Sequence, residues 1–172
     1  MKIQTIVIDD FYENPNDVRN YALNNLLYTE HDFHPGIRTE NLFFDKVKNK
    51  IQSYIESSFG TIEEIIINFQ INTAFEKSWI HRDSNKTNLA GILYLTPDAP
   101  LASGTELYLP NDSPTSEREF FKWKKQIKIG NKYNRLLLFR CDILHKSSTY
   151  FGTDKNNGRL IQLFFIKTSL DT

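Results

Sequence analysis

The sequence holds a single cysteine, Cys141, among 172 residues. One thiol excludes an intrachain disulfide and a zinc site built from several thiolates. Cys141 follows the apolar run Leu136–Phe139, so we interpret it as a packed, small hydrophobic residue rather than a nucleophile. A reducing cytoplasm is the compartment that this cysteine usage predicts.

Net charge and long hydrophobic runs are also lacking. The 21 Lys and Arg residues balance 21 Asp and Glu residues, so no global field attracts a polyanion, and nucleic acid is not indicated as a partner. No run approaches the roughly 20 apolar residues of a membrane span. The first residues reach Asp9 and Asp10 without the apolar stretch of a signal peptide. We therefore expect no membrane association and a cytoplasmic location.

Aromatic residues are abundant, with 13 Phe, 8 Tyr and 2 Trp, and such residues favour half-buried sheets. The length suits one domain over residues 1–172. An opening strand is expected at residues 3–8. A first helix follows, with Asn14 as its cap and Pro15 in its first turn, and a polar loop Thr29–Glu40 leads to a second helix from about Asn41 to Phe59.

After Gly60 the pattern changes to short β-branched and aromatic segments separated by Gly, Pro, Asn and Asp, which predicts a β-sandwich or barrel. The stretch Thr96–Ser116 is expected to be looped around a short strand near Thr105–Leu109. Residues Glu117–Lys125 are expected to form a short helix or an excursion over the sheet. The fold class is therefore mainly β (α+β), with supporting helices in residues 1–60 and a β core in residues 61–168.

His81-Arg82-Asp83 is the most informative motif. At the end of a strand, residues two apart point to the same face, so His81 and Asp83 present an imidazole and a carboxylate side by side. His145, just after the apolar segment NRLLLF, is a candidate third ligand. Two histidines and one carboxylate form the facial triad of non-haem Fe(II) oxygenases, which leaves coordination positions open. The alternative is a surface turn in which Asp83 caps a loop.

Arg159 opens the last strand, GRLIQLFFI. A guanidinium at the end of an inward-facing strand can hold a carboxylate through two parallel hydrogen bonds, as a dicarboxylate such as 2-oxoglutarate would require. The alternative is an exposed ion pair, with Asp154 as the candidate partner.

The segments HRD (81–83), NRLLLFRCDILHKS (134–147) and GRLIQLFFI (158–166) resemble the iron- and 2-oxoglutarate-dependent dioxygenases, especially their prolyl hydroxylase-like branch. The resemblance covers about Ile65 to Lys167. It implies a double-stranded β-helix (jelly-roll, cupin-like) core with the N-terminal helices on the major sheet. It also implies Fe(II) ligation by His81, Asp83 and His145, with Arg159 anchoring 2-oxoglutarate.

The family often has a hydroxyl residue two positions after the anchoring arginine, where this chain has Ile161. Tyr94 and Tyr108 are the candidate replacements. The segment His34-Pro35-Gly36-Ile37-Arg38 resembles a P-G-x-R stretch of a little-studied subset, often encoded by phages or bacteria. If the chain is phage-encoded, it would act in the host cytoplasm.

The resemblance implies a hydroxylase that uses Fe(II), 2-oxoglutarate and O₂, and releases succinate and CO₂. The expected substrate is a small molecule or a peptidyl side chain, with Arg38 and Trp79 as candidate contacts; the oligomeric state is open. Two alternatives are a cupin-like metalloprotein that does not use 2-oxoglutarate and a non-enzymatic jelly-roll binding protein. The four histidines of the chain are few for a cupin site.

Overall fold

The computed structural model describes residues 5–30, 32–83, 86–110 and 123–170. Its elements, in chain order, are β1 (Thr5–Ile8), α1 (Pro15–Asn25), β2 (Thr29–Glu30), β3 (Ile37–Arg38), α2 (Asp45–Phe59), β4 (Ile62–Asn72), β5 (Leu89–Tyr94), the 3₁₀ turn η1 (Leu101–Ser103), β6 (Thr105–Pro110), β7 (Trp123–Ile129), β8 (Leu136–Arg140), β9 (Leu144–Ser147) and β10 (Arg159–Thr168). The predicted mainly β class with two N-terminal helices is confirmed.

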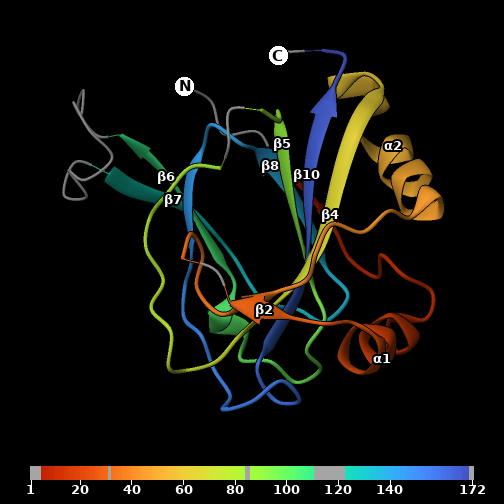
Figure 1. Ribbon diagram of the computed structural model, residues 1–172. Coiled ribbons are helices and arrows are strands. Elements are labelled where there is room, and N and C mark those ends of the chain that lie inside the picture. The colour runs from red at the N-terminus through yellow and green to blue at the C-terminus, as the bar shows by residue number, and fades with distance from the viewer. Residues whose placement is uncertain (1–4, 31, 84–85, 111–122, 171–172) are drawn as a thin grey trace.

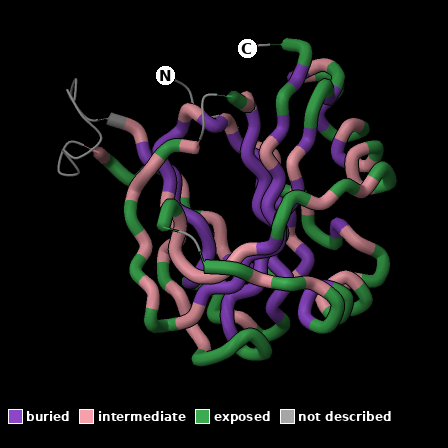
Figure 2. Tube along the Cα trace, viewed as in Figure 1, coloured by how far each residue is buried: buried purple, intermediate pink, exposed green. Residues whose placement is uncertain are grey.

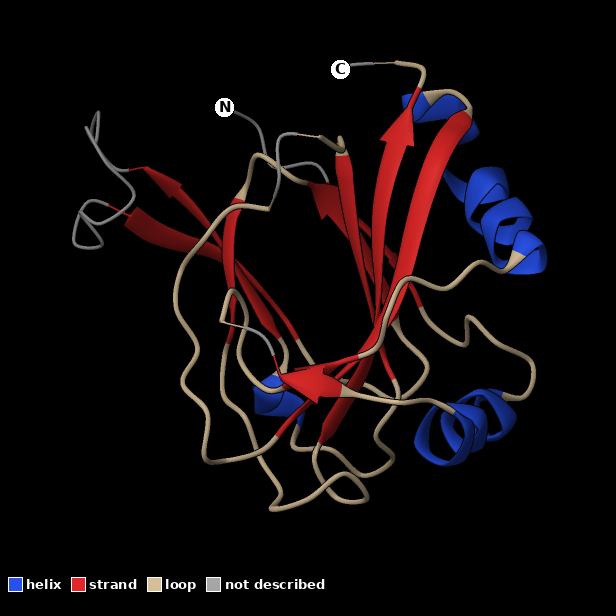
Figure 3. Cartoon of the chain, in the orientation of Figure 1, coloured by secondary structure: helices blue, strands red, loops and turns tan. Residues whose placement is uncertain are grey.

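Two antiparallel sheets face each other (Figures 1 and 3). In the described residues, the major sheet has the order β1-β8-β5-β10-β4-β3-β2, and the minor sheet has the order β7-β6-β9. A backbone bridge between His81 and His145 adds the segment around His81 beside β9. The three strands of the minor sheet and the segment at His81 thus lie opposite the central strands β8, β5, β10 and β4, as in a jelly roll.

Alternation along β4 explains how the layers assemble. Odd-numbered residues from Ile65 to Ile71 enter a core with α1, α2 and one face of β10. Both helices lie on this outer side of the major sheet (Figure 1). The even-numbered residues point to the inner face, and from Asn68 to Asn72 they are polar. The buried residues follow the central strands, and the exposed ones lie mainly in the connecting loops and on the outer helices (Figure 2).

A second core fills the space between the sheets. Leu107 and Ile127 of the minor sheet pack with Ile92, Leu137 and Ile161 of the major sheet. Ile161 belongs to the face of β10 that also carries Arg159, because residues two apart share a face. The inner face of β10 therefore runs from an apolar core to a buried arginine at the start of the strand.

The second helix begins at Asp45, four residues later than expected. The reason is that Leu42 donates its backbone N–H to the carbonyl of Ile67 and is bridged to β4, so this segment is extended. Asn14 occupies the N-cap position of α1, but its side chain makes no capping hydrogen bond. Its backbone carbonyl accepts from Asp17 instead.

Two further loop predictions need correction or lie outside the described residues. The expected loop Thr29–Glu40 contains the short strands β2 and β3, which extend the major sheet beyond β4. Of the expected helix or excursion Glu117–Lys125, residues 117–122 lie outside the described residues, and Trp123–Lys125 form the start of β7. The strand near Thr105–Leu109 is confirmed as β6.

Candidate metal centre

His81 and His145 are backbone partners. The N–H of His81 donates to the carbonyl of His145 at 3.0 Å, and the N–H of His145 donates to that of His81 at 2.9 Å. Such a pair points its side chains to the same face. The two imidazole centroids lie 4.4 Å apart, and the ring of His145 also contacts Phe139.

The rings of both histidines are oriented in the same way. Nδ1 of His81 lies 3.0 Å from the carbonyl oxygen of Trp79, and Nδ1 of His145 lies 3.0 Å from that of Ile143. A carbonyl accepts, so each Nδ1 carries the proton and each Nε2 is left as a basic lone pair. This is the arrangement in which metal-binding histidines are usually held.

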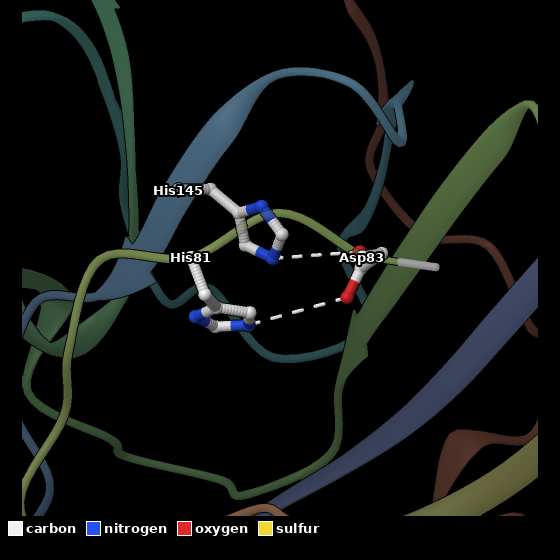
Figure 4. Close-up of side chains that lie close together, drawn as sticks. All are labelled: His81, Asp83 and His145. Carbon is white, nitrogen blue, oxygen red and sulfur yellow. Dashed lines mark ion pairs between the residues drawn. The ribbon is translucent and has the colours of Figure 1, made fainter. Parts of the chain in front are cut away.

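Asp83 completes the cluster (Figure 4). One carboxylate oxygen lies 4.0 Å from Nε2 of His81, and the other lies 3.5 Å from Nε2 of His145. The three ligand atoms all lie within 4.8 Å of one another. Two imidazole nitrogens and one carboxylate oxygen are the donor set of a non-haem Fe(II) site, so these residues fit such an ion.

The sequence predicted that His81 lies at the end of the preceding strand, and this prediction is wrong. Strand β4 ends at Asn72, and Thr73 and Glu76 then form a turn in which the Glu76 carboxylate accepts from the backbone N–H of Thr73 at 2.5 Å. The chain returns to the sheet only at His81. The expected proximity of His81 and Asp83 nevertheless holds, because His81 regains extended pairing with His145.

The candidate metal cluster (His81, Asp83 and His145; called the metal cluster below) opens into a pocket between the sheets. Besides the three candidate ligands, its wall includes Arg38, Gln70, Trp79, Tyr150, Ile161 and Phe165. Burial lowers the pKa of Arg38 to about 10, against the opposing effect of Asp83, so this arginine is cationic at neutral pH. Trp79 is 44% exposed, and its ring centroid lies 6.2 Å from that of His81. The structure thus places both Arg38 and Trp79 beside the metal cluster.

Arg159 is completely buried. Its Nε donates to the carbonyl of Ser103 at 3.2 Å, whereas within the described residues Nη1 and Nη2 have no hydrogen-bond partner. Its guanidinium carbon lies 5.5 Å from the ring centroid of Tyr94 and 5.9 Å from that of Tyr150. Burial lowers the pKa of Arg159 from its ordinary value, against the opposing effects of Tyr94 and Tyr150, and a carboxylate would relieve the cost of burial.

The alternative of an exposed Arg159 paired with Asp154 is therefore wrong. Asp154 instead accepts from the backbone N–H of Asn156 at 2.7 Å. The tyrosine ring that links Arg159 to the pocket is that of Tyr150, which lines the pocket wall. Sequence reasoning missed Tyr150 because it lies in a loop, and nothing in the local pattern shows that the loop returns to the inner face.

The two tyrosines proposed as co-substrate contacts, Tyr94 and Tyr108, lie in different surroundings. Tyr94 is buried beside Arg159, and its hydroxyl lies 2.8 Å from Oγ1 of Thr105. Tyr108 shares a face of β6 with Glu106 and donates its hydroxyl to that carboxylate at 2.5 Å. The opposite face of β6 carries Leu107, the register partner of His145. The structure thus brings Tyr94, but not Tyr108, toward Arg159.

No family model matches the chain, and no curated protein is similar to it in sequence. Solved structures do share its fold. A prolyl hydroxylase from Trichoplax adhaerens, in complex with a peptide of a hypoxia-inducible factor, superposes with a TM-score of 0.64 at 14% identity, over 95% of this chain and 83% of that one.

HygX from Streptomyces hygroscopicus, with nickel and 2-oxoglutarate bound, gives a TM-score of 0.64 at 11% identity, over 99% of this chain and 85% of that one. A prolyl 4-hydroxylase from Pseudomonas putida gives 0.57 at 11% identity, over 97% and 94%. At these identities the similarity shows the fold. The predicted jelly-roll core is therefore confirmed.

In the described residues, no helix is both long and apolar enough to span a membrane.

Proposed function

We propose that the protein is an Fe(II)- and 2-oxoglutarate-dependent oxygenase that hydroxylates a C–H bond of a small-molecule or peptidyl substrate. The observation that carries this proposal is the coexistence of two incomplete sites on the inner face. His81, Asp83 and His145 present a donor set suited to Fe(II), and Arg159 is a buried cation whose Nη1 and Nη2 have no partner among the described residues.

Each residue has a distinct role in this proposal. The two imidazoles and Asp83 hold the ion, with Trp79 and Ile143 fixing the imidazole orientation through their carbonyl oxygens. Arg159 binds the distal carboxylate of 2-oxoglutarate, and the Tyr94 hydroxyl, near Thr105, is the nearby polar group that replaces the one absent at Ile161. The bound ion, 2-oxoglutarate and O₂ supply the oxidising chemistry: one oxygen atom enters succinate, CO₂ leaves, and the other oxygen atom enters the substrate.

The relatives in fold agree with this assignment without deciding it. HygX has also been solved with nickel, 2-oxoglutarate and the small molecule hygromycin B bound, and the Trichoplax enzyme with a peptide. Small molecules and peptides thus both bind to proteins of this fold. The site geometry of the present chain, rather than these relatives, supports the choice of co-substrate.

The test is an anaerobic titration of the apoprotein with Fe(II) and 2-oxoglutarate. We expect a weak charge-transfer band in the visible region, and succinate release when O₂ is admitted. Asp83→Ala should abolish both. Asp142→Ala is the matched control, because Asp142 is a partly exposed carboxylate paired with Arg140, outside the metal cluster.

The two alternatives predict different outcomes. A binding protein would give neither the band nor succinate. A cupin-like metalloprotein would bind Fe(II) through the same three residues. Its metal-dependent spectrum would not change when 2-oxoglutarate is added or when Arg159 is replaced.

A further inference from the structure

The hairpin formed by β2 and β3 is fixed to the inner edge of β4 at Pro35 and Gly36. The carbonyl of Pro35 accepts from the side-chain amides of Gln70 at 3.0 Å and Asn72 at 2.8 Å. Gly36 has φ +72°, and a Cβ at this position would lie 2.2 Å from the carbonyl oxygen of Ile71. Only glycine allows the backbone to approach β4 so closely.

Arg38 follows on β3 and is the register partner of Gln70. Its Nε donates to Oε1 of Gln70 at 2.9 Å, and its Nη2 donates to the same oxygen. The amide of Gln70 cannot turn away, because its Nε2 also donates to Oδ1 of Asn72 at 2.9 Å. The guanidinium carbon lies 5.9 Å from the ring centroid of Phe165. Arg38 is thus held in one orientation at the pocket wall.

The positive charge of Arg38 has no acidic partner of its own. Within the described residues, no carboxylate lies within 4.0 Å of the guanidinium, and Nη1 has no hydrogen-bond partner. Asp83 is the acidic group whose charge acts on Arg38, and it is a candidate metal ligand. A bound ion would offset the charge of Asp83, which leaves Arg38 as an uncompensated cation facing the pocket.

The charge of Arg38 is also not needed to hold the hairpin. Besides the Pro35 contacts, the backbone N–H of Thr39 donates to the carbonyl of Phe69 at 2.9 Å, and the side chain of Thr39 accepts from the N–H of Phe69 at 3.0 Å. A neutral donor at position 38 would complete that attachment equally well. A fixed, partly desolvated guanidinium, by contrast, is suited to bind a carboxylate through charge-assisted hydrogen bonds.

We propose that Arg38 binds an anionic group of the primary substrate, specifically a carboxylate, and that Gln70 is the residue that positions it. This inference rests on the proposed function and specifies its substrate class. The pocket wall adds a preference for the rest of the molecule: Phe33, which is 92% exposed, and Trp79 offer aromatic surface beside Arg38. The substrate is therefore an acid with an apolar or aromatic body.

The test uses protein loaded with Ni(II) and 2-oxoglutarate, so that the co-substrate occupies its own site and no turnover occurs. The probes are N-acetyl amino acids with apolar side chains, their carboxamides, and blocked pentapeptides that end in the same residues as acids or as amides. Binding is measured by calorimetry. We expect single acids or acid-ended peptides to bind about 10- to 100-fold more tightly than the matching amides.

Arg38→Met should remove this preference by weakening acid binding about 10- to 100-fold while changing amide binding less than about threefold. Arg140→Met is the matched control, because Arg140 is paired with Asp142 and does not line the pocket. Gln70→Leu should weaken acid binding to an intermediate extent. Adding Gln70→Leu to Arg38→Met should cost no further affinity, which separates positioning of Arg38 from a general structural role.

Equal binding of acids and amides, an unaltered acid preference in Arg38→Met, or no binding of any acid would each overturn the inference. Failure of the proposed function is a separate result, since it would already show as absent binding of 2-oxoglutarate to the Ni(II)-loaded protein. Binding of single acids alone would identify a free small acid, and binding of acid-ended pentapeptides alone would identify a chain terminus. Either result supports the inference.

Discussion

Replacing Arg159 by methionine should stabilise the free protein and abolish its stabilisation by 2-oxoglutarate. The wild-type guanidinium is fully buried, with Nη1 and Nη2 unpartnered among the described residues. Each unsatisfied buried donor costs about 1–3 kcal/mol. The methionine side chain loses the hydrogen bond to Ser103 and the contacts with two tyrosine rings, together about 2–3 kcal/mol. The net expectation is that Arg159→Met stabilises the free protein by about 1–2 kcal/mol.

Thermal unfolding of the metal-loaded protein is the assay. For a chain of this length, such a gain raises the melting temperature by roughly 2–8 °C. Adding 2-oxoglutarate at about 100 times its dissociation constant should stabilise the wild type by about 2.7 kcal/mol. The variant should show no such increment. Arg140→Met, which removes a partly exposed arginine, should leave both quantities nearly unchanged.

Two results would refute this reasoning. If Arg159→Met lowered the melting temperature substantially, the guanidinium would be stabilising the free fold, and its burial would need no ligand to explain it. If the 2-oxoglutarate increment survived in the variant, Arg159 would not be the carboxylate anchor.

Two other predictions concern the hairpin and the thiol. Gly36→Ala should lower the free energy of unfolding by at least about 2 kcal/mol in urea titrations, because a side chain there meets the Ile71 carbonyl at a positive φ; a loss below 0.5 kcal/mol would contradict the close approach. Burial raises the pKa of Cys141 to about 12, so the native thiol should resist a disulfide reagent at pH 8 and react fully in denaturant. Since the unfolded thiol ionises near pH 9 and the folded thiol does not, this residue should make the protein less stable as pH rises from about 9 to about 12; rapid native labelling would contradict the assignment.

The grouping of the three candidate ligands could be predicted from the sequence in part because of local signals. His81 and Asp83 are two positions apart, and His145 lies in β9, shortly after the apolar strand β8. The hairpin residues could not be placed in this way. The role of Gln70 depends on a register with Arg38 across 32 positions, and a glutamine within a β-branched run gives no sign of it.

Errors in the helix and strand boundaries have a common physical origin. Asn41–Phe44 continues the apolar spacing of α2, yet Leu42 finds a backbone partner on β4 that local propensity cannot reveal. Tyr108 and Tyr94 are similar in sequence context, but the pairing of β6 with β9 sets Leu107 opposite His145 and leaves the buried Tyr108 on the other face with Glu106. In both cases a long-range pairing overrides the local signal.

The reciprocal backbone hydrogen bonds between His81 and His145 fix the spacing of the two imidazoles independently of the length of the loop that precedes His81. Residues 73–78 should tolerate changes in length or composition, provided that Trp79 keeps its carbonyl at Nδ1 of His81, because the two backbone N–H···O contacts set the ligand spacing. An insertion that slipped this pairing by one residue would turn one ligand to the opposite side. The loop that carries Trp79 is therefore a suitable place for transplanting segments when substrate selectivity is to be redesigned.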